Sequence, residues 1–469
     1  MPTYTTPGVY VNIVPPTSQP IAGVGTTTPA IIGFGADLKP QQMPPKPGTT
    51  QTFNNGTVTI TGGTATLAGG AKWPAVSPTQ DAKLNLGSQS FVATRTGDTT
   101  LTLASPPPDN STAQSFVLTI TDHYSQAAVN TPTLVTDWSS YIQNFGDFQQ
   151  ISTNNNYLAH AVYGFFANGG TTCYIARFNE DPTATSMPAT LSTSLQAALN
   201  LLAARDDVAM VCAPMPDNVP STTLAIVQNA VVSHCELLQN RFAILDSANV
   251  SSVTGVTPPG TFTNGCEAFY VPWVMVADPI VQGGILAVPP SGHVAGVYAR
   301  TDNTRGVFKA PANEELLTVL DLAATISDAD QSLLNPIGVN CLRVIGGTPL
   351  VWGARTLSSD PQFLYVNVRR FLIFLRESIR LNLLWATFEP NSQGLWQTIK
   401  RSVSDFLLTQ WQEGALLGDT PQQAYFVICD STTNTPDVIN QGMVVTTIGV
   451  AVVKPAEFVV FNIQQQTGS

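Results

Sequence analysis

Residues 336–390 read PIGVNCLRVIGGTPLVWGARTLSSDPQFLYVNVRRFLIFLRESIRLNLLWATFEP. This stretch decides the fold class because a strand pattern and a helix pattern follow each other in it. Its first part is apolar and β-branched and is interrupted by Gly346-Gly347, which predicts a strand, a turn and a second strand. The polar group Ser358-Ser359-Asp360 then precedes Pro361, a pattern that predicts the start of a helix.

That helix is expected to have a broad apolar side and one basic side. Arg369, Arg376 and Arg380 are spaced by seven and four residues, so they share one side of it. The opposite side is apolar and carries Val366, Phe371, Phe374, Leu375 and Ile379. From the residues alone, the stretch is the buried core of an α/β domain.

Three phrases in and just after this stretch carry a resemblance: VWGARTLSSDP, YVNVRRFLIFLRESI and WATFEPNSQGLW. They resemble the C-terminal core of contractile tail sheath proteins. Those proteins form the outer sheath of contractile phage tails, R-type bacteriocins and related bacterial injection systems. The resemblance implies a multi-domain α/β (α+β) fold, with mixed sheets flanked by helices and extended β arms at both ends.

Composition favours a large assembly subunit. At roughly 100–200 residues per domain, 469 residues predict two to four domains. Charged residues are only 11% and hydrophobic residues 43%, with 35 Gly and 35 Pro. Such a neutral, turn-rich chain suits a subunit buried among copies of itself. An ordinary secreted β-rich protein is the alternative on composition alone.

Charge and hydropathy argue against several other classes. The net charge of −11 disfavours a nucleic-acid partner, which requires a basic patch. The start, MPTYTTPGVY, lacks the features of a secretion signal, and apolar runs such as Ile448–Val453 fall far short of a membrane span. Synthesis in the cytosol without direct membrane insertion is therefore expected. The six cysteines are scattered, without C-x-x-C, and are expected to be buried thiols.

Residues 1–20 are predicted to be an N-terminal β arm. TPGVYVNIV alternates like a strand, and Pro15-Pro16 ends it. The residues allow a strand within its own domain or one that adds to another sheet. YTTPGVYVNIV resembles the N-terminal arm of sheath proteins, which implies that it augments the sheet of a neighbouring subunit. The candidate arm residues are Val9, Tyr10, Val11 and Ile13.

Residues 21–46 are expected to begin the core, with strand residues at Ile21, Val24, Ile31 and Ile32. Residues 47–125 then become rich in Thr, Ser, Gly and Ala, with short alternating runs and turn signals. This pattern predicts a small all-β module, a sandwich or barrel, and a flexible linker is the alternative. The module carries no sheath phrase, so it is interpreted as an insertion, most simply on the outer surface of an assembly.

Residues 126–335 alternate between helix and strand patterns. Helices are expected near residues 158–166, 191–204 and 223–238, and strands near 173–176, 208–212 and 242–245. Such alternation predicts a mainly parallel sheet in an α/β domain. VTDWSSYIQNFG and YLAHAVYGFFANGGTTCYIARF again resemble the sheath family.

The phrase VPPSGHVAGVYARTDNTRGVFKAPANE is the most specific resemblance outside the C-terminal core. Its small residues, Ser291, Gly292, Ala295 and Gly296, indicate close approach of another element. A polar turn is expected after them, across which Asp302 and Arg305 are near enough to pair.

An enzymatic reading of the same phrase makes Ser291, His293 and Asp302 a hydrolase triad. It is disfavoured because triad members usually lie far apart in sequence and no G-x-S-x-G elbow is present. His293 is expected instead to be a polar residue packed in a loop. The other histidines, His123, His160 and His234, form no metal-ligand spacing, so no metal, cofactor or catalytic residue is predicted.

Residues 336–455 are assigned to a C-terminal inner core domain, which includes the amphipathic helix LWQTIKRSVSDFLLTQWQEG. A surface helix packed on the core is the plain interpretation. The sheath resemblance implies that a helix of this domain holds the inner tube, and Lys400 and Arg401 are the candidates for that contact.

The end of the chain is predicted to be strand-rich, with runs at residues 424–429, 443–453 and 456–463. Residues 456–469 are assigned to a C-terminal β arm, which the resemblance pairs with another subunit. No charged side chain occurs in residues 1–36 or after Glu457, so both ends of the chain are uncharged and β-prone, which is unusual for termini left in water. The candidate residues are Phe458, Val459, Val460, Phe461 and Ile463.

The resemblance as a whole implies a sheath subunit that forms stacked hexameric rings around an inner tube and contracts. Its expected partners are copies of itself, the inner tube protein, and baseplate and terminal cap proteins. The particle would be assembled in the bacterial cytoplasm as a phage tail or phage tail-like injection system. A non-contracting tube, capsid or surface-layer subunit is the alternative.

Overall fold

The structure is a computed structural model that describes residues 20–458, apart from residues 70, 152–153, 156 and 184–188. The described residues form two compact units. The C-terminal unit contains the described parts of Met1–Gly25 and Tyr365–Ser469, together with Arg305–Ala310. The sheet unit contains Thr26–Thr304 and Pro311–Leu364.

This division differs from the ranges expected from sequence. The strands that follow Pro336, β21 (Val339–Ile345) and β22 (Thr348–Val351), continue the large sheet of the sheet unit. The C-terminal unit therefore begins at Tyr365 and takes in a segment before Thr26, which the sequence assigned to the start of the core.

The sheet unit is built on a nine-stranded sheet in the order β10-β13-β1-β14-β15-β16-β21-β22-β19. Pairing is parallel from β13 to β21 and antiparallel at β10, β22 and β19, so the predicted mainly parallel sheet is confirmed. The other bounds are β10 Thr133–Val135, β13 Cys173–Phe178, β1 Pro29–Phe34, β14 Met210–Cys212, β15 Phe242–Asp246, β16 Glu267–Val271 and β19 Glu314–Glu315.

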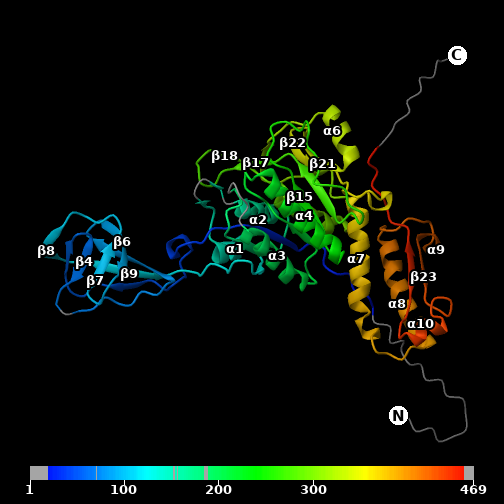
Figure 1. Ribbon diagram of the computed structural model, residues 1–469, viewed down its shortest axis with the longest axis horizontal. Helices are drawn as coiled ribbons and strands as arrows, with labels where there is room; N and C mark the ends of the chain where they lie inside the picture. Colours follow the sequence, from blue (N-terminus) through cyan, green and yellow to red (C-terminus); the bar gives the residue numbers. More distant parts are fainter. Residues whose placement is uncertain (1–19, 70, 152–153, 156, 184–188, 459–469) are drawn as a thin grey trace, which may run out of the picture. The chain divides into compact units, whose positions relative to one another are not determined.

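The central strands are apolar and buried on both faces, as parallel strands usually are. Every residue of β1, β13, β14, β15 and β16 is buried. The helices of this unit are α1 Trp138–Phe145, α2 Tyr157–Ala167, α3 Ala189–Ala203, α4 Ser221–Leu238, α5 Ser291–Arg305 and α6 Asp328–Leu334 (Figure 1). Smaller sheets are formed by β17 (Val274–Ala277), β18 (Ile285–Val288) and β20 (Val319–Leu322), and by β11 (Gln150–Ile151) and β12 (Asn154–Asn155).

The polar turn predicted after Gly296 is wrong, because Ser291–Arg305 is one continuous helix, α5. His293 accordingly lies in a helix, not in a loop. The helix has buried residues at ten of its fifteen positions, including nine in succession from Ser291 to Ala299. A helix covered on all sides has no apolar stripe, so its sequence lacks the periodicity by which helices are recognised.

The predicted close approach at the small residues of α5 is confirmed. A Cβ on Gly292 would lie 2.5 Å from the Cα of Ala161 in α2. A Cβ on Gly296 would lie 2.5 Å from the carbonyl oxygen of Phe165 in the same helix. The two helices can approach this closely only because glycine leaves room for the α2 backbone.

The predicted all-β module is a folded eight-stranded antiparallel sheet, with the order β2-β9-β5-β6-β7-β4-β3-β8. Alternation places Val58 and Ile60 in its core and leaves Thr59 and Thr61 outside. Trp73 packs on Phe116 at a ring distance of 5.0 Å. The strands are β2 Gln51–Phe53, β3 Val58–Thr61, β4 Thr64–Leu67, β5 Gln80–Leu86, β6 Gln89–Arg95, β7 Thr100–Leu103, β8 Asn110–Gln114 and β9 Val117–Asp122.

The C-terminal unit pairs two long helices with a small sheet. Helices α7 (Val366–Asn382) and α8 (Gln393–Gln412) lie side by side, with Phe374 and Phe406 in ring contact at 6.0 Å (Figure 1). Strands β23 (Tyr425–Ile428) and β24 (Thr447–Val450) form a two-stranded antiparallel sheet. The remaining short helices are α9 (Pro421–Ala424) and α10 (Pro436–Asn440).

Helix α7 begins five residues after the predicted start at Pro361. Asp360 instead caps a short 3₁₀ turn, Pro361–Phe363, by accepting a hydrogen bond from the N–H of Gln362 (2.8 Å). The hydroxyls of Ser358 and Ser359 donate to the carbonyl oxygens of Thr263 and Phe262, so they fasten a loop and do not cap the helix.

Candidate assembly surfaces

Helix α7 holds the N-terminal segment of the C-terminal unit at its own C-terminal end. The side-chain oxygen of Asn382 accepts a hydrogen bond from the N–H of Ala22 (3.2 Å), and its Nδ2 donates to the Ala22 carbonyl oxygen (2.9 Å). One turn earlier, Ser378 Oγ accepts from the N–H of Val24 (3.1 Å). The side chain of Ile21 is buried in the hydrophobic core beside them.

The other end of α7 contacts the last described segment of the chain. Asn367 Nδ2 donates to the carbonyl oxygens of Phe308 (2.7 Å) and Val453 (3.2 Å). The hydroxyl of Tyr365 donates to Glu457 Oε2 (3.1 Å). The two terminal segments are thus attached at opposite ends of one 17-residue helix, about 25 Å apart along its axis.

No other described strand joins the sheet formed by β23 and β24, although Leu416 forms an isolated antiparallel bridge with Val452, just after β24. The eight residues of the sheet are uncharged. Phe426 is 52% exposed and lies across Gly449 on the facing strand. A two-stranded sheet is marginal alone, and its unpaired backbone groups are a template for further strands.

Eight of the nine predicted arm residues lie outside the described residues: Val9, Tyr10, Val11, Ile13, Val459, Val460, Phe461 and Ile463. Phe458 is described: it is 73% exposed and belongs to no strand. Of the predicted C-terminal strands, β23 and β24 form within the expected ranges, although β24 is shorter than the run from Met443 to Val453.

Lys400 and Arg401 lie on α8, as predicted. The helix buries Leu395, Ile399 and Val403 in the hydrophobic core of the C-terminal unit and leaves Arg401 exposed and Lys400 half-buried. The pKa of Asp430 is lowered, chiefly by hydrogen bonds from Thr432 and to a smaller extent by the nearby Lys400 charge. Because Arg401 is exposed and Lys400 is half-buried, Arg401 is the more accessible of the two cations.

The hydrolase triad is not assembled. Ser291 is fully buried, and its hydroxyl donates to Asp246 Oδ2 (2.6 Å) while its N–H donates to Asp246 Oδ1 (2.7 Å). His293 and Asp302 are nine residues apart in α5, about 13 Å along the helix axis. Asp302 accepts a hydrogen bond from Thr26 Oγ1 (2.6 Å).

Sequence reasoning did not find the Asp246–Ser291 contact. Asp246 ends β15, Ser291 begins α5, and both are buried. Burial raises the pKa of Asp246 to about 7, although the hydrogen bonds from Ser291 act in the opposite direction. The Asp246 carboxyl fixes the start of α5. The only indication of this contact in the sequence is a polar residue at the end of a buried strand.

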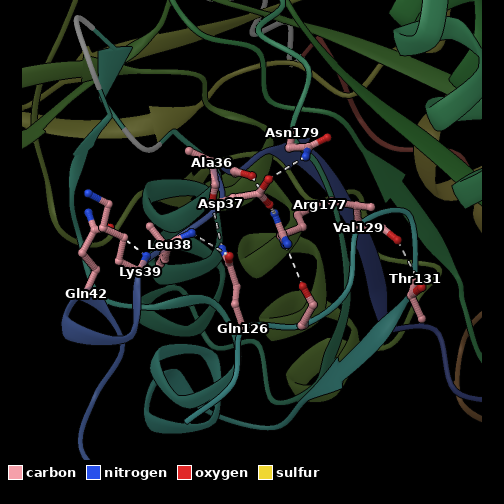
Figure 2. Close-up of polar contacts among 12 residues, drawn as sticks. Ala36, Asp37, Leu38, Lys39, Gln42, Gln126, Val129, Thr131, Arg177 and Asn179 are labelled. Atoms are coloured by element: carbon pink, nitrogen blue, oxygen red, sulfur yellow. Dashed lines mark hydrogen bonds and ion pairs between the residues drawn. The ribbon is translucent and has the colours of Figure 1, made fainter. Parts of the chain in front are cut away.

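Another polar cluster lies where the chain enters and leaves the all-β module (Figure 2). Arg177 Nε donates to the Ala127 carbonyl (2.7 Å), and its NH1 donates to the Gly35 carbonyl (3.0 Å) and to Asp37 Oδ1 (2.9 Å). Bonds from Asn179 and Arg177 lower the pKa of Asp37.

Gln126 completes this cluster from the returning chain. Its side-chain oxygen accepts from the N–H of Leu38 (2.9 Å), and its Nε2 donates to the Ala36 carbonyl (2.9 Å), as Figure 2 shows. The two connections of the module are therefore held together next to the end of β13, which contributes Arg177.

Further features concern the described ranges only. No group of three or more His, Cys, Asp or Glu there is suited to hold a metal. None of the helices in that part has the length and apolar character that crossing a bilayer requires. All six cysteines are buried and unpaired, as predicted.

The fold is that of a contractile sheath subunit. It aligns with the anti-feeding prophage helical sheath in the contracted state with a TM-score of 0.64 and 24% identity, covering 99% of this chain and 100% of that chain. The sheath complex of the extracellular contractile injection system PVC, also contracted, aligns with a TM-score of 0.63 and 22% identity over 99% of both chains.

The sequence identifies the family. Residues 191–357 match the phage tail sheath protein central domain, and residues 358–466 match the phage tail sheath C-terminal domain. The chain therefore belongs to the phage tail sheath family, a family of structural proteins.

Among curated relatives, the tail sheath protein of Enterobacteria phage T4 is 29% identical over 180 residues, which are 37% of this chain and 26% of that protein. The putative prophage major tail sheath protein of Pseudomonas aeruginosa (strain UCBPP-PA14) is 26% identical over 232 residues, 47% of this chain and 57% of that protein. The chain thus matches between about a quarter and somewhat over half of these relatives' lengths.

Proposed function

We propose that the protein polymerises as stacked hexameric rings around an inner tube and contracts to drive that tube through a target envelope. The observation that carries the proposal is the uncharged two-stranded sheet of β23 and β24, whose outer edges pair with no other described strand apart from the isolated Leu416–Val452 bridge just after β24. Unpaired backbone groups at such edges promote aggregation in water unless other strands cover them.

The strands that cover these edges are proposed to come from neighbouring subunits. The N-terminal arm (Val9, Tyr10, Val11 and Ile13) and the C-terminal arm (Phe458, Val459, Val460, Phe461 and Ile463) supply them by β-augmentation. The attachment of both terminal segments to the ends of α7 supports this role, because it places both arms on the unit that carries the acceptor sheet.

Contraction depends on two kinds of contact between subunits: the shared strands, and the surfaces at which the folded bodies touch. The shared strands are short tethers with directional backbone hydrogen bonds, so they keep the subunits linked while the folded bodies slide and rotate. Additional burial of surface between bodies then drives the change, and no nucleotide or catalytic residue takes part.

The remaining partners are proposed from the family. Lys400 and Arg401 would contact an acidic surface of the inner tube, while baseplate and terminal cap proteins would bind the ends of the sheath. The assembly would form in the bacterial cytoplasm. We place the all-β module, residues 47–125, on the outer surface, because an insertion there disturbs the packing of subunits least.

Electron microscopy of the chain expressed alone tests the proposal. We expect wide, striated, hollow tubes from the natural chain and only dispersed, folded protein after deletion of Met1–Pro16. Tubes from the deletion variant would refute the tether role of the N-terminal arm. In the presence of the tube protein we expect sheaths of a second diameter, which would be the extended state. Sheaths of one diameter under all conditions would favour a rigid structural tube.

A further inference from the structure

The first described residues of the chain run antiparallel to α7 and belong to no helix or strand. Ala22 meets Asn382 and Val24 meets Ser378, so two residues of the segment match four residues of the helix. The spacing fits, because two extended residues advance about 6.8 Å and four helical residues about 6 Å. The segment therefore keeps its register along the helix.

Three kinds of contact hold this segment. Ile21 is only 8% exposed and packs in the hydrophobic core of the C-terminal unit. The amide of Asn382 pairs with both backbone polar groups of Ala22, as a strand partner would. Gly23 lies so close to Phe374 that a Cβ there would be 3.0 Å from two atoms of its ring.

From these contacts we infer that Ile21–Val24 is an anchor that fixes the root of the N-terminal arm on α7, with Asn382 and Ser378 as its positioning residues. The role of the arm as a tether rests on the proposed function, whereas the anchor is a property of the single chain. Tension in the arm is delivered to the C-terminal end of α7, and the tether begins before Ile21.

The anchor sets the reach of the arm. Four residues released from α7 would lengthen the tether by up to about 14 Å, at up to 3.6 Å per extended residue. A longer tether would still link two subunits, but it would no longer fix their separation. Loss of the anchor and loss of the arm therefore have different consequences for a sheath.

The test is hydrogen–deuterium exchange on the full-length, unassembled chain. Asn382→Leu removes both bonds to Ala22, and Ser378→Ala removes the bond to Val24. We expect the Ala22 amide to exchange about fivefold faster in the first variant and the Val24 amide about fivefold faster in the second. Asn382→Asp keeps the acceptor for the Ala22 N–H, so the exchange rate of that amide should return toward the natural one.

Asn434→Leu is the matched control, since Asn434 binds both backbone groups of Val445 in the same unit. It should accelerate exchange at Val445 and leave Ala22 unchanged. An unchanged Ala22 rate in Asn382→Leu would overturn the anchor. So would an equal acceleration of all amides in the unit, because Asn382 would then serve general stability alone.

Micrographs of the same proteins complete the test. We expect the Asn382→Leu/Ser378→Ala chain to form tubes whose axial repeat is blurred, while Asn434→Leu keeps a sharp repeat in any tubes that it forms. A sharp repeat in the double variant would overturn the claim that the anchor sets the reach of the arm. Tubes from the Met1–Pro16 deletion would refute the tether itself and leave the exchange result standing.

Discussion

The side-chain amide of Asn168 forms both hydrogen bonds of a strand pair with the backbone of Leu317, which lies 149 positions later. Its Nδ2 donates to the Leu317 carbonyl oxygen (3.1 Å), and its Oδ1 accepts from the Leu317 N–H (2.8 Å). Asn340 binds Arg355 in the same way, and Asn434 binds Val445. In a chain with 11% charged residues, neutral amides fix contacts between segments that are 11 to 149 positions apart in sequence.

Replacement of one of these amides should be costly. We expect Asn168→Leu to lower the free energy of unfolding by about 2–4 kcal/mol, because two backbone groups of Leu317 lose their partners in a part-buried place. Urea unfolding of the unassembled chain measures this. Asn200→Ala, an exposed change on α3, should stay within about 0.5 kcal/mol. Equal losses in both variants would contradict the structural role of Asn168.

A second prediction concerns the contact between α5 and α2. Gly292→Ala would place a methyl group on the backbone of Ala161, which cannot move aside as a flexible side chain can. We expect a loss of about 3 kcal/mol or more in the free energy of unfolding, as for severe overpacking. Thermal unfolding measures it. Gly260→Ala is the control, because its new Cβ would meet no atom closer than 3.5 Å, and a similar melting temperature for the two variants would argue against the contact.

The elements of the sheet unit were predictable where local pattern and burial agree. The strand at residues 242–245 and the helix at 223–238 lie within β15 and α4, because apolar runs and turn residues mark them clearly. Helix α5 was missed because it is buried on nearly all sides, so no apolar stripe distinguishes it.

Contacts between distant residues were not predictable from local pattern. Nothing near Ala22 in sequence indicates a partner 360 positions away at Asn382. The predicted C-terminal domain boundary at Pro336 differs from the boundary at Tyr365 because local pattern does not show that β21 and β22 join the large sheet. Asp246 and Ser291 are likewise 45 positions apart, and only the fold brings them together. The family resemblance supplied the assembly role, which no single-chain periodicity carries.

A third prediction concerns the polar cluster at the base of the all-β module. The side chain of Arg177 is 7% exposed and donates to Ala127, Gly35 and Asp37. We expect Arg177→Met to lower the free energy of unfolding by about 3 kcal/mol, because buried carbonyl oxygens lose their donors.

Hydrogen–deuterium exchange provides a local measure of the same change. The Leu38 N–H, which donates to Gln126 Oε1 in this cluster, should exchange faster in Arg177→Met. Arg95→Met is the control, since Arg95 pairs with the exposed Asp98 within the module and its loss should cost little. An unchanged exchange rate of the Leu38 amide would show that Arg177 does not hold the connections.

A fourth prediction is a pH dependence due to His160 in α2. Burial lowers the pKa of His160 to about 4, although Asp278 acts in the opposite direction. The unfolded chain binds this proton near pH 6.5 and the folded chain does not, so the free energy of unfolding falls as the pH drops through this range. Between pH 7 and pH 5, the natural chain should lose about 2 kcal/mol more than His160→Gln.

Urea unfolding of both chains at several pH values measures this difference. Asp246, whose pKa burial raises to about 7, titrates in the same range with the opposite sign. It is present in both chains, so its contribution cancels in the comparison. Parallel pH profiles for the two chains would show that His160 titrates normally in the folded protein.

The last prediction tests the proposed contact with the inner tube. Arg401 is exposed on α8 and Lys400 half-buried, whereas the opposite side of the helix is buried in the core of its unit. Reversal of both charges, Lys400→Glu/Arg401→Glu, should therefore leave the fold intact and repel an acidic tube.

We expect that double variant to form sheaths of normal diameter that are empty when the tube protein is co-expressed, with the fraction of filled sheaths in micrographs as the measurement. Lys39→Glu/Lys83→Glu changes the net charge equally at exposed positions of the sheet unit, so its sheaths should be filled. Comparison of the two double variants separates a local contact from a general charge effect. Long-range repulsion by the added negative charge alone would empty both kinds of sheath, and this repulsion would weaken with salt. Filled sheaths in the α8 variant would move the tube contact to another surface, whereas empty sheaths in that variant alone would assign it to Lys400 and Arg401.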